Sequence, residues 1–326
     1  MDKNVILVTG GAGYIGSHTV KKLIKNGYNV IVVDDLSTGC RDAVGGADLV
    51  VGDFADADLL GKIINEHKPD AVIHFAASKD APESVIKPDK YFYNNTAKTI
   101  IFLNTLLKKN VKNIIFSSTA AVYGDVQSFP ITEDFPIQPT NPYGESKAMI
   151  EKILLEYQKA LGLCPVILRY FNAGGADPEH ELGNRYPDPK DVISVLMNVA
   201  SGVGESFSVF GTDYETRDGT CIRDIIHVDD LAEAHVLALG LLINKKKTGV
   251  YNLGSEEGFT IREIVNSTKK VTKKDFKVVE APRREGDIVV SIASSEKARR
   301  ELGWRSKYSI KDIIETAYSW RQSQGN

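Results

Sequence analysis

Cysteine is scarce in this chain of 326 residues, and its few copies lie far apart. Cys40, Cys164 and Cys221 form neither a Cys-x-x-Cys pair nor a Cys/His cluster. This spacing disfavours both a disulfide framework and a structural zinc site. We therefore predict that the protein binds no metal, and a reducing cytoplasm is the simplest setting for it.

Long apolar runs and an excess of charge of one sign are missing as well. No segment reaches the roughly 18 uninterrupted apolar residues of a membrane span. The first residues, MDKNVILVTGG, lack the long apolar region and the cleavage site of a signal peptide. The formal net charge is only -3, which gives no electrostatic reason to expect a polyanion. We expect neither nucleic acid nor a membrane as a partner.

Short apolar runs alternate with helical patterns through the first half of the chain. Continuous apolar runs are typical of strands buried on both faces, and strands that alternate with helices indicate a parallel sheet. The fold class predicted is therefore α/β, with a doubly wound parallel sheet of the Rossmann type. The strands are expected at 4–10, 29–34, 47–53, 71–77, 113–119 and 165–171, and the helices at about 14–26, 57–67, 88–109 and 143–161.

The pattern loosens after residue 175, where proline, glycine and charged residues are frequent and the expected elements are shorter. We interpret this part as a second, smaller α/β lobe that returns one segment to the first domain. The predicted first domain comprises residues 1–176 plus about 222–250, and the predicted second lobe comprises residues 177–221 plus 251–326.

A glycine-rich turn follows the first expected strand, in the stretch VTGGAGYIGSH. Gly11, Gly13 and Gly16 fit the pattern G-x-G-x-x-G, and Gly10 is in register for a second version of it. Small residues here allow a tight turn, close approach of a pyrophosphate and close packing of helix on strand. The helix that follows adds backbone amides and the positive end of its dipole. The turn therefore predicts a dinucleotide site.

Two acids follow later strands of the same domain. Asp34 ends the second expected strand, where a carboxylate accepts a hydrogen bond from the ribose 2′-hydroxyl of a dinucleotide. An acid at this point also repels a 2′-phosphate, so NAD is favoured over NADP. Asp53 ends the third strand, and its carboxylate could accept from the adenine amino group.

The stretch NPYGESK places Tyr143 and Lys147 four residues apart at an expected helix start, which Asn141 and Pro142 suit. An i,i+4 pair alone often only decorates a helix face. Beside a cationic nicotinamide ring, however, the lysine charge favours the tyrosine phenolate, a base. Thr119 ends the fifth strand, where ligands of open α/β sheets bind. The three residues together predict a site that oxidises a hydroxyl group.

The chain resembles the extended short-chain dehydrogenase/reductase family, and within it the UDP-glucose 4-epimerase-like enzymes. The resemblance covers nearly the whole chain and is carried by motifs in the same order: GGAGYIGSHTV, HFAASK, FSSTAAVYG, NPYGESK, LRYFNAGGA, VFGTDY, IRDIIHVDDLAEAH, YNLGS and APRREGD. It implies an isomerase with tightly bound NAD in the first domain and a UDP-sugar in the second lobe. It also implies a homodimer that pairs the helices at 88–109 and 143–161.

The resemblance implies a mechanism as well. Tyr143 removes the proton of the sugar 4-hydroxyl, hydride passes from carbon 4 to NAD⁺, and the 4-keto sugar turns over before the hydride returns to its other face. Thr119 bridges the sugar oxygen and the tyrosine, and Lys147 tunes the tyrosine and bonds the cofactor ribose. There is no net oxidation, so the cofactor is regenerated in each turnover.

Further site residues are implied by the same resemblance. The cofactor residues, besides Tyr143 and Lys147, are Gly10, Gly13, Tyr14, Ile15, Gly16, Asp34, Asp35, Leu36, Ser37, Asp53, Phe54, Phe75, Ala76, Ala77, Lys79, Asn94, Ser117 and Tyr170. The substrate residues, besides Thr119 and Tyr143, are Lys79, Phe171, Asn172, Val192, Phe210, Arg223, Arg284, Asp287 and Ser291.

Two positions bear on the reaction and the substrate. Related decarboxylases and 4,6-dehydratases carry acidic residues after the Ser/Thr, whereas this chain has Ala120 and Ala121, which cannot serve as an extra acid or base. Ser291 stands where some relatives have a bulky tyrosine beside the sugar 2-substituent. We therefore hypothesise that UDP-GlcNAc and UDP-GalNAc fit as well as UDP-glucose and UDP-galactose.

Alternatives remain open at this point. The substrate could be UDP-xylose, UDP-arabinose or UDP-glucuronate, or the chain could be a net dehydrogenase that exchanges its cofactor. A non-catalytic NAD sensor should have lost Thr119, Tyr143 or Lys147, and all three are present.

Overall fold

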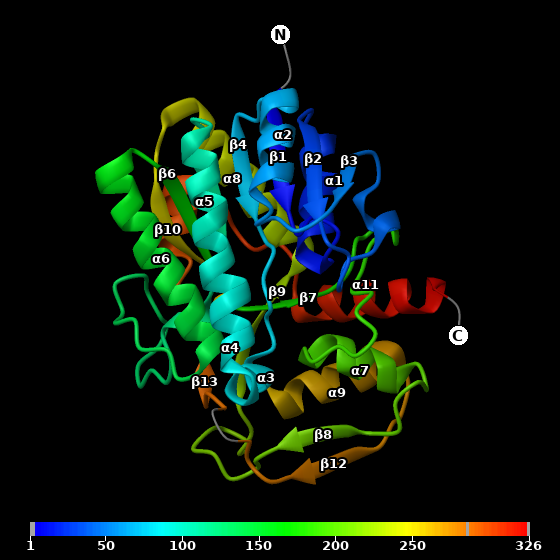
Figure 1. Ribbon diagram of the computed structural model, residues 1–326. Coiled ribbons are helices and arrows are strands. Elements are labelled where there is room, and N and C mark those ends of the chain that lie inside the picture. The colour runs from blue at the N-terminus through cyan, green and yellow to red at the C-terminus, as the bar shows by residue number, and fades with distance from the viewer. Residues whose placement is uncertain (1–3, 285–286, 325–326) are drawn as a thin grey trace.

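The computed structural model describes residues 4–284 and 287–324. Its largest element is a seven-stranded sheet in the order β10-β6-β5-β4-β1-β2-β3, with every neighbouring pair parallel (Figure 1). This confirms the predicted fold class. The strands are β1 (Val5–Thr9), β2 (Asn29–Asp34), β3 (Asp48–Val51), β4 (Ala71–His74), β5 (Asn113–Thr119), β6 (Cys164–Tyr170) and β10 (Gly249–Leu253).

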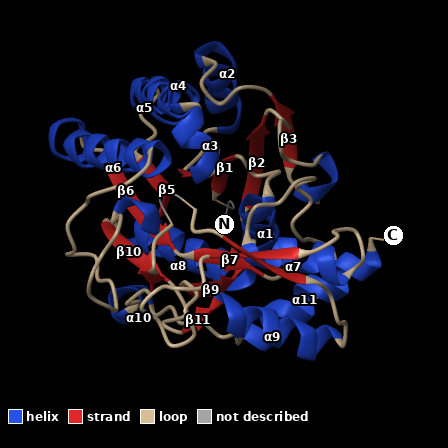
Figure 2. Ribbon diagram, turned by 90° about the horizontal axis from the view of Figure 1, so that it is seen from below, coloured by secondary structure: helices blue, strands red, loops and turns tan. Residues whose placement is uncertain are grey.

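Helices cover both faces of this sheet (Figure 2). On one face α1 (Tyr14–Lys25) and α8 (Val228–Lys245) pack against Ile6 and Val8 of β1. On the other face α2 (Ala57–His67), α5 (Lys98–Lys108) and α6 (Pro142–Leu161) enclose Leu7. Because both faces are covered, the strands are apolar along their whole length, which is the pattern that made them recognisable.

The helix expected at 88–109 is not a single α-helix. It consists of α4 (Pro88–Tyr91), the π-helical turn η2 (Phe92–Ala97) and α5, and a short α3 (Ala81–Ile86) precedes it. Buried Asn95 lies in the π-helical turn and donates to the Ser78 carbonyl at 2.9 Å and the Ser146 hydroxyl at 3.0 Å. A wide turn of this kind is frequent at functional sites.

The second lobe lies below the main sheet in Figure 1. Its central strand, β9, pairs parallel with β7 and β13 and antiparallel with β11, while β8 and β12 form a separate parallel pair. The strands are β7 (Asn172–Gly174), β8 (Phe207–Phe210), β9 (Ile222–His227), β11 (Gly258–Thr260), β12 (Val278–Ala281) and β13 (Val290–Ser291). The helices are α7 (Val192–Ala200), α9 (Ile261–Thr272) and α11 (Ile310–Ser323). The first domain also contains α10 (Glu296–Leu302), whose Ala298 and Leu302 belong to the core on the α1/α8 face, and two 3-10 turns, η1 (Arg41–Val44) and η3 (Ala120–Val122).

Two segments that we placed in the second lobe lie in the first. Residues 251–253 belong to β10 at the edge of the main sheet. Trp304 is buried in the core on the α1/α8 face, and its indole N–H donates to the Asp230 carbonyl at 2.8 Å. The predicted boundary at residue 250 therefore lies inside β10. The sequence alone does not assign this strand to the main sheet, because its partner β6 is remote in the sequence.

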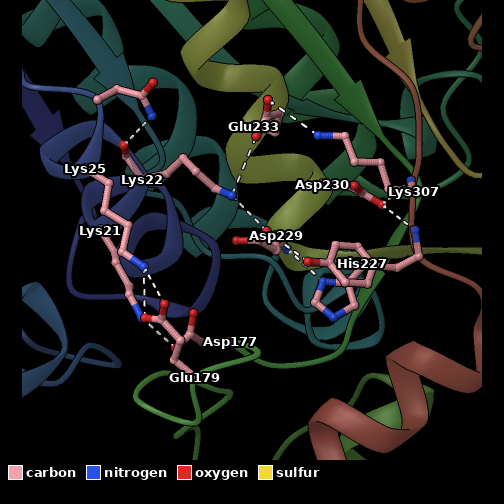
Figure 3. Close-up of polar contacts among 12 residues, drawn as sticks. Lys21, Lys22, Lys25, Asp177, Glu179, His227, Asp229, Asp230, Glu233 and Lys307 are labelled. Atoms are coloured by element: carbon pink, nitrogen blue, oxygen red, sulfur yellow. Dashed lines mark hydrogen bonds and ion pairs between the residues drawn. The ribbon is translucent and has the colours of Figure 1, made fainter.

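Ion pairs link α1 with the loop after β7 and with α8 (Figure 3). Lys21 contacts Asp177 at 2.7 Å, and Lys22 contacts Asp229 at 2.8 Å. His227 caps α8 by accepting from the Asp229 N–H at 3.0 Å, and its Nε2 lies 3.0 Å from the Thr316 hydroxyl of α11. Over the described residues, no helix has the length and apolarity needed to cross a membrane.

Candidate active site

The glycine turn between β1 and α1 has the shape of a phosphate cradle. Gly10 has φ +72, and a Cβ there would lie 2.6 Å from the Ala76 nitrogen. A Cβ at Gly16 would collide with the Gly10 carbonyl. Gly13 precedes α1 without any side-chain cap, and the first turn contains no acid. The helix amides are therefore free to bind an anion, which fits the pyrophosphate of NAD.

Asp34 lies directly beside this turn at the end of β2. One carboxylate oxygen accepts from the Ala12 N–H and the other from the Leu36 N–H, both at 2.9 Å. Burial raises the pKa of Asp34 above its ordinary value. A carboxylate oxygen has two acceptor positions, so each retains one for a ribose hydroxyl. Asp34 is thus placed both to shape the turn and to bind the ribose.

The remaining predicted cofactor residues near the adenine end lie in the loops after β2 and β3. Leu36 has φ +58, and the Ser37 hydroxyl donates to Asp35 at 2.6 Å. Asp53 is ion-paired with Lys98 at 2.6 Å; burial alone would raise the Asp53 pKa, but the Lys98 contact lowers it. Phe54 is buried, and its ring packs on His74.

At the other end of the cradle, residues after β4 and β6 form the wall. The N–H groups of Phe75 and Ala76 donate to the Thr9 carbonyl at 2.9 and 3.2 Å. Asn94 donates to the Ser78 hydroxyl at 3.2 Å. The adjoining residues are Ala77, which is partly buried, and Lys79, which is exposed.

Two tyrosines complete the surroundings of the cradle. Tyr170 is buried, and its hydroxyl has no hydrogen-bond partner among the described residues. A buried hydroxyl of this kind calls for a polar partner, and a bound dinucleotide would supply one. Tyr14 opens α1, next to Ile15, and donates to the Gly175 carbonyl at 2.5 Å.

The predicted catalytic pair, Tyr143 and Lys147, lies on the first turns of α6, so the expected helix start is confirmed. Asn141 caps this helix by accepting from the Gly144 N–H at 2.9 Å, and Pro142 follows it. Thr119, at the end of β5, accepts from the Ala121 N–H at 3.1 Å and so also serves as a cap. Burial raises the pKa of Tyr143, while its hydrogen bond with Thr119 acts in the opposite direction.

Lys147 lies one turn further along α6 and is 3% exposed. Its ammonium donates to the Ser117 carbonyl at 2.8 Å and lies 4.8 Å from the centre of the Phe116 ring. Burial lowers the pKa of Lys147 to about 7, and the charge of Glu151 opposes this shift. The sequence predicts a phenolate from the lysine charge together with a cationic nicotinamide ring. Among the protein's own groups burial raises the Tyr143 pKa and the Thr119 contact opposes this, so the cationic ring would be needed to lower the pKa.

Sequence reasoning missed a buried polar network directly behind this pair. Glu151 accepts from Arg169 Nη2 at 2.6 Å and from Arg169 Nε at 3.0 Å, and Ser118 donates to the same carboxylate. Arg169 also donates to the Tyr123 hydroxyl at 2.7 Å. An arginine inside the apolar run PVILRYF was the available signal, because a buried charge requires a partner.

Four predicted substrate residues meet at the opposite wall, in the second lobe. Arg284 forms a two-point ion pair with Asp287, with both contacts at 3.0 Å. The Arg284 guanidinium lies 4.4 Å from the centre of the Phe210 ring, and Arg223 Nη2 is 4.0 Å from Asp287. Two guanidinium groups beside an aromatic ring suit a nucleoside diphosphate.

The other predicted substrate residues lie on neighbouring strands. Asn172, in β7, donates to the Asp224 carbonyl at 3.1 Å. Ser291, in β13, is buried and pairs in register with Arg223 of β9. Phe171 is buried beside Tyr123 in a small apolar cluster. Val192 begins α7 and packs against the core of the second lobe, so only its backbone is suited to a polar contact.

Comparisons with known proteins agree with the family that the sequence resembles. A model of the NAD dependent epimerase/dehydratase family matches residues 6–254. A UDP-glucose 4-epimerase of Halalkalibacterium halodurans is 46% identical over 318 residues, which are 97% of this chain and 95% of that protein. The structure of UDP-glucose 4-epimerase from Brucella ovis in complex with NAD has a TM-score of 0.94 at 44% identity and covers 97% of this chain and 98% of that one. The UDP-Glc/GlcNAc 4-epimerase of Campylobacter jejuni has a TM-score of 0.85 at 40% identity and covers 98% and 99%.

Proposed function

The chain belongs to the NAD dependent epimerase/dehydratase family, and from this we infer that it is an NAD-dependent UDP-hexose 4-epimerase. It inverts carbon 4 and so interconverts UDP-glucose and UDP-galactose. The observation that supports this function is that Thr119 ends β5 and the glycine turn follows β1 at the same edge of the parallel sheet, with Tyr143 and Lys147 on the first turns of α6. In the second lobe, Arg223 and Arg284 lie together beside Asp287.

The residues of the chain divide the work as follows. NAD⁺, which the glycine turn and Asp34 would hold, would supply the acceptor and the donor of the carbon 4 hydride. Tyr143 removes the proton of the 4-hydroxyl and gives it back, which a positioned side chain does well when its pKa is near the working pH. Thr119 holds the reacting oxygen, and Lys147, fixed on the Ser117 carbonyl, supplies positive charge below the tyrosine.

The anchoring residues let the sugar turn while the nucleotide stays bound. Arg223 and Arg284 hold the diphosphate, and Phe210 packs on the uracil. Small Ala120 and Ala121, in the turn after Thr119, provide no further acid or base, so the reaction ends with the return of the hydride.

An exposed apolar face on η2, α5 and α6 supports a homodimer. Tyr93, Ile101, Met149 and Leu155 are 64%, 45%, 38% and 39% exposed there. Apolar residues gathered on neighbouring helices are typical of a subunit interface. Light scattering of the purified protein should give twice the chain mass. The free cysteines, two of them only partly buried, are consistent with a cytoplasmic enzyme.

Ser291 is the residue on which we base N-acetyl tolerance. Its small side chain is buried in the substrate wall, and a related structure is that of a UDP-Glc/GlcNAc 4-epimerase. Ser291→Tyr should abolish turnover of UDP-GlcNAc and spare that of UDP-glucose, while Ser291→Ala, the control, keeps both. Equal loss of both activities in Ser291→Tyr would reject the size argument.

Proton NMR of the purified protein with UDP-glucose, without added cofactor, tests the function. A growing anomeric signal of UDP-galactose, together with absorbance from retained NAD(H), is expected. Absence of turnover with NAD retained would reject the substrate and direct attention to pentose or uronic UDP-sugars. Turnover that requires added NAD would reject a tightly bound cofactor.

A further inference from the structure

Asp224 is a buried carboxylate in the substrate lobe that no step of the proposed reaction uses. It lies in β9, directly after Arg223, and is 0% exposed. One carboxylate oxygen accepts from the N–H and the hydroxyl of Ser255 at 2.7 and 2.6 Å. The other accepts from the N–H groups of Glu256 and Ala293, both at 3.1 Å. All four acceptor positions of the carboxylate are therefore occupied.

These four bonds join three segments that are far apart in the sequence. Ser255 and Glu256 follow β10, the edge strand of the main sheet, and Ala293 follows Ser291 by two residues. The backbone carbonyl of Asp224 in turn accepts from the Asn172 amide at 3.1 Å. Asp224 thus lies at the crossing of β7, β9, β13 and the turn after β10.

The turn after β10 is shaped to receive this carboxylate. A Cβ at Gly254 would collide with Asp224 Oδ2 and would lie 2.5 Å from the Ala293 Cβ. This contact gives a physical reason for glycine and serine to follow each other in the motif YNLGS. The motif pairs in space with the aspartate of IRDIIHVDDLAEAH.

The strand that carries Ser291 is fixed at other points as well, and Ser295, which follows it, bonds Gly254 and Glu256 of the turn after β10. β13 is only two residues long and pairs with β9 at Ile222 and Arg223. Beyond it, Ile131 brackets the strand through its N–H to the Ile292 carbonyl and its carbonyl to the Ser294 N–H, both at 2.8 Å. The bond from the Ala293 N–H to Asp224 fixes this strand on the side that faces β9.

We propose that Asp224 is a positioning residue of the substrate pocket, whose carboxylate sets the register between the strand of Arg223 and the strand of Ser291. It touches neither substrate nor cofactor. It determines the position of Arg223, which binds the diphosphate, relative to Ser291, which lies beside the sugar. The proposal rests on the proposed function, because it concerns the pocket for the UDP-sugar.

The structure supplies a matched control. Asp230, in α8, is also buried, and it accepts from the Lys307 N–H at 2.9 Å and from the Ser306 hydroxyl at 3.2 Å. It holds the loop between α10 and α11, and its side-chain bonds within the described residues go to that loop and not to β13 or the turn after β10. Asp224→Asn and Asp230→Asn therefore make the same chemical change in two buried networks, and only the first touches the pocket.

An asparagine at 224 cannot replace the carboxylate. If its NH₂ group faced the N–H groups of Glu256 and Ala293, both would lose their acceptor, and if it faced Ser255, the Ser255 N–H would lose its acceptor while the hydroxyl could turn to accept. Ser255→Ala is a milder variant that removes the hydroxyl bond to Asp224, together with the hydroxyl's contacts to the Glu257 backbone, and keeps the bond from the Ser255 N–H. It provides an answer even where Asp224→Asn does not fold.

The test is titration calorimetry with UDP and steady-state epimerisation of UDP-galactose, with NAD content and melting temperature measured on the same samples. For Asp224→Asn we expect UDP affinity and KM to worsen by about tenfold or more, with kcat within about threefold and NAD retained. Asp230→Asn should lose stability and keep its UDP affinity, and Ser255→Ala should lie between wild type and Asp224→Asn.

Two results would overturn the proposal. One is an Asp224→Asn variant that loses stability as Asp230→Asn does but binds UDP like wild type. The other, decisive where Asp224→Asn does not fold, is a Ser255→Ala variant with wild-type UDP affinity and KM. Wild-type protein that binds no UDP would instead overturn the proposed function, and this inference with it.

Discussion

The ion pair between Glu151 and Arg169 offers the sharpest test of how the active site is supported. Glu151 is 4% exposed and Arg169 5% exposed. They share three contacts, the shortest of 2.6 Å, and lie behind the helix that carries Tyr143 and Lys147. Glu151→Gln keeps the shape of the side chain and removes its charge, so Arg169 remains buried with no countercharge.

The expected loss of stability is large, although Glu151→Gln only replaces a carboxylate oxygen with an amide NH₂ group. Breaking a buried pair by neutralising one partner costs about 3–5 kcal/mol, because the remaining charge is still desolvated. A change of 1 kcal/mol moves the melting temperature of a protein of 150–250 residues by about 2–4 °C. The larger size of this chain favours the lower slope of about 2 °C per kcal/mol, so we expect the melting temperature of Glu151→Gln to fall by about 6–10 °C.

Thermal unfolding followed by far-UV circular dichroism measures this change. Glu156→Gln is the control, because Glu156 lies on the same helix, is 61% exposed and pairs with Lys159 at 2.9 Å. An exposed pair contributes about 0–1 kcal/mol, so the control should melt within about 2 °C of wild type. If Glu151→Gln melts as close to wild type as Glu156→Gln does, the reasoning about buried charge is wrong.

Three further outcomes follow from the site and its surroundings. Tyr143→Phe should lower kcat by about 10²- to 10⁴-fold and leave NAD content unchanged, and loss of NAD instead would point to a structural role. Gly16→Ala should purify with little NAD, because its Cβ meets the Gly10 carbonyl; wild-type NAD absorbance would contradict the cradle geometry. Burial lowers the pKa of His235 to about 4, so the unfolded chain takes up its proton first as pH falls below about 6.5. As pH falls, the free energy of unfolding of the wild type should therefore decrease by up to about 1.4 kcal/mol per pH unit more than that of His235→Leu. Chemical denaturation at several pH values between 7 and 5 measures this, and an equal pH dependence in the two proteins would contradict it.

The main sheet was predictable because its strands are buried on both faces. The expected ranges 29–34 and 113–119 coincide with β2 and β5, since a covered parallel strand is apolar along its whole length. The break in the helix at 88–109 was not predictable, because the π-helical turn goes with bonds from Asn95 to Ser78 and Ser146 that exist only in the folded chain. The assignment of 251–253 failed for the same reason, since β10 is defined by its distant partner β6.

The candidate site also contains some features that local sequence determines and others that depend on contacts made only in the folded chain. Tyr143, Lys147 and the glycine turn are local patterns, so the sequence was sufficient to find them. The pKa of Lys147 was not accessible from spacing, because it depends on how deeply the fold buries the ammonium group. Asp224 and Glu151 were missed because their hydrogen-bond partners lie on other elements of the fold. No pattern in the neighbouring sequence predicts those contacts.

The exchange of segments between the two lobes also constrains how the polypeptide matures. The main sheet is complete only when β10 is in place, and the core on its α1/α8 face only when Trp304 is buried. Before β10 emerges from the ribosome, β9 of the other lobe must already have been synthesised. Neither lobe can therefore complete its fold during translation before most of the other lobe has been synthesised. We expect the two lobes to fold late and together. We expect the nascent chain to need protection from aggregation almost to its last residues, and the finished enzyme to melt in one transition.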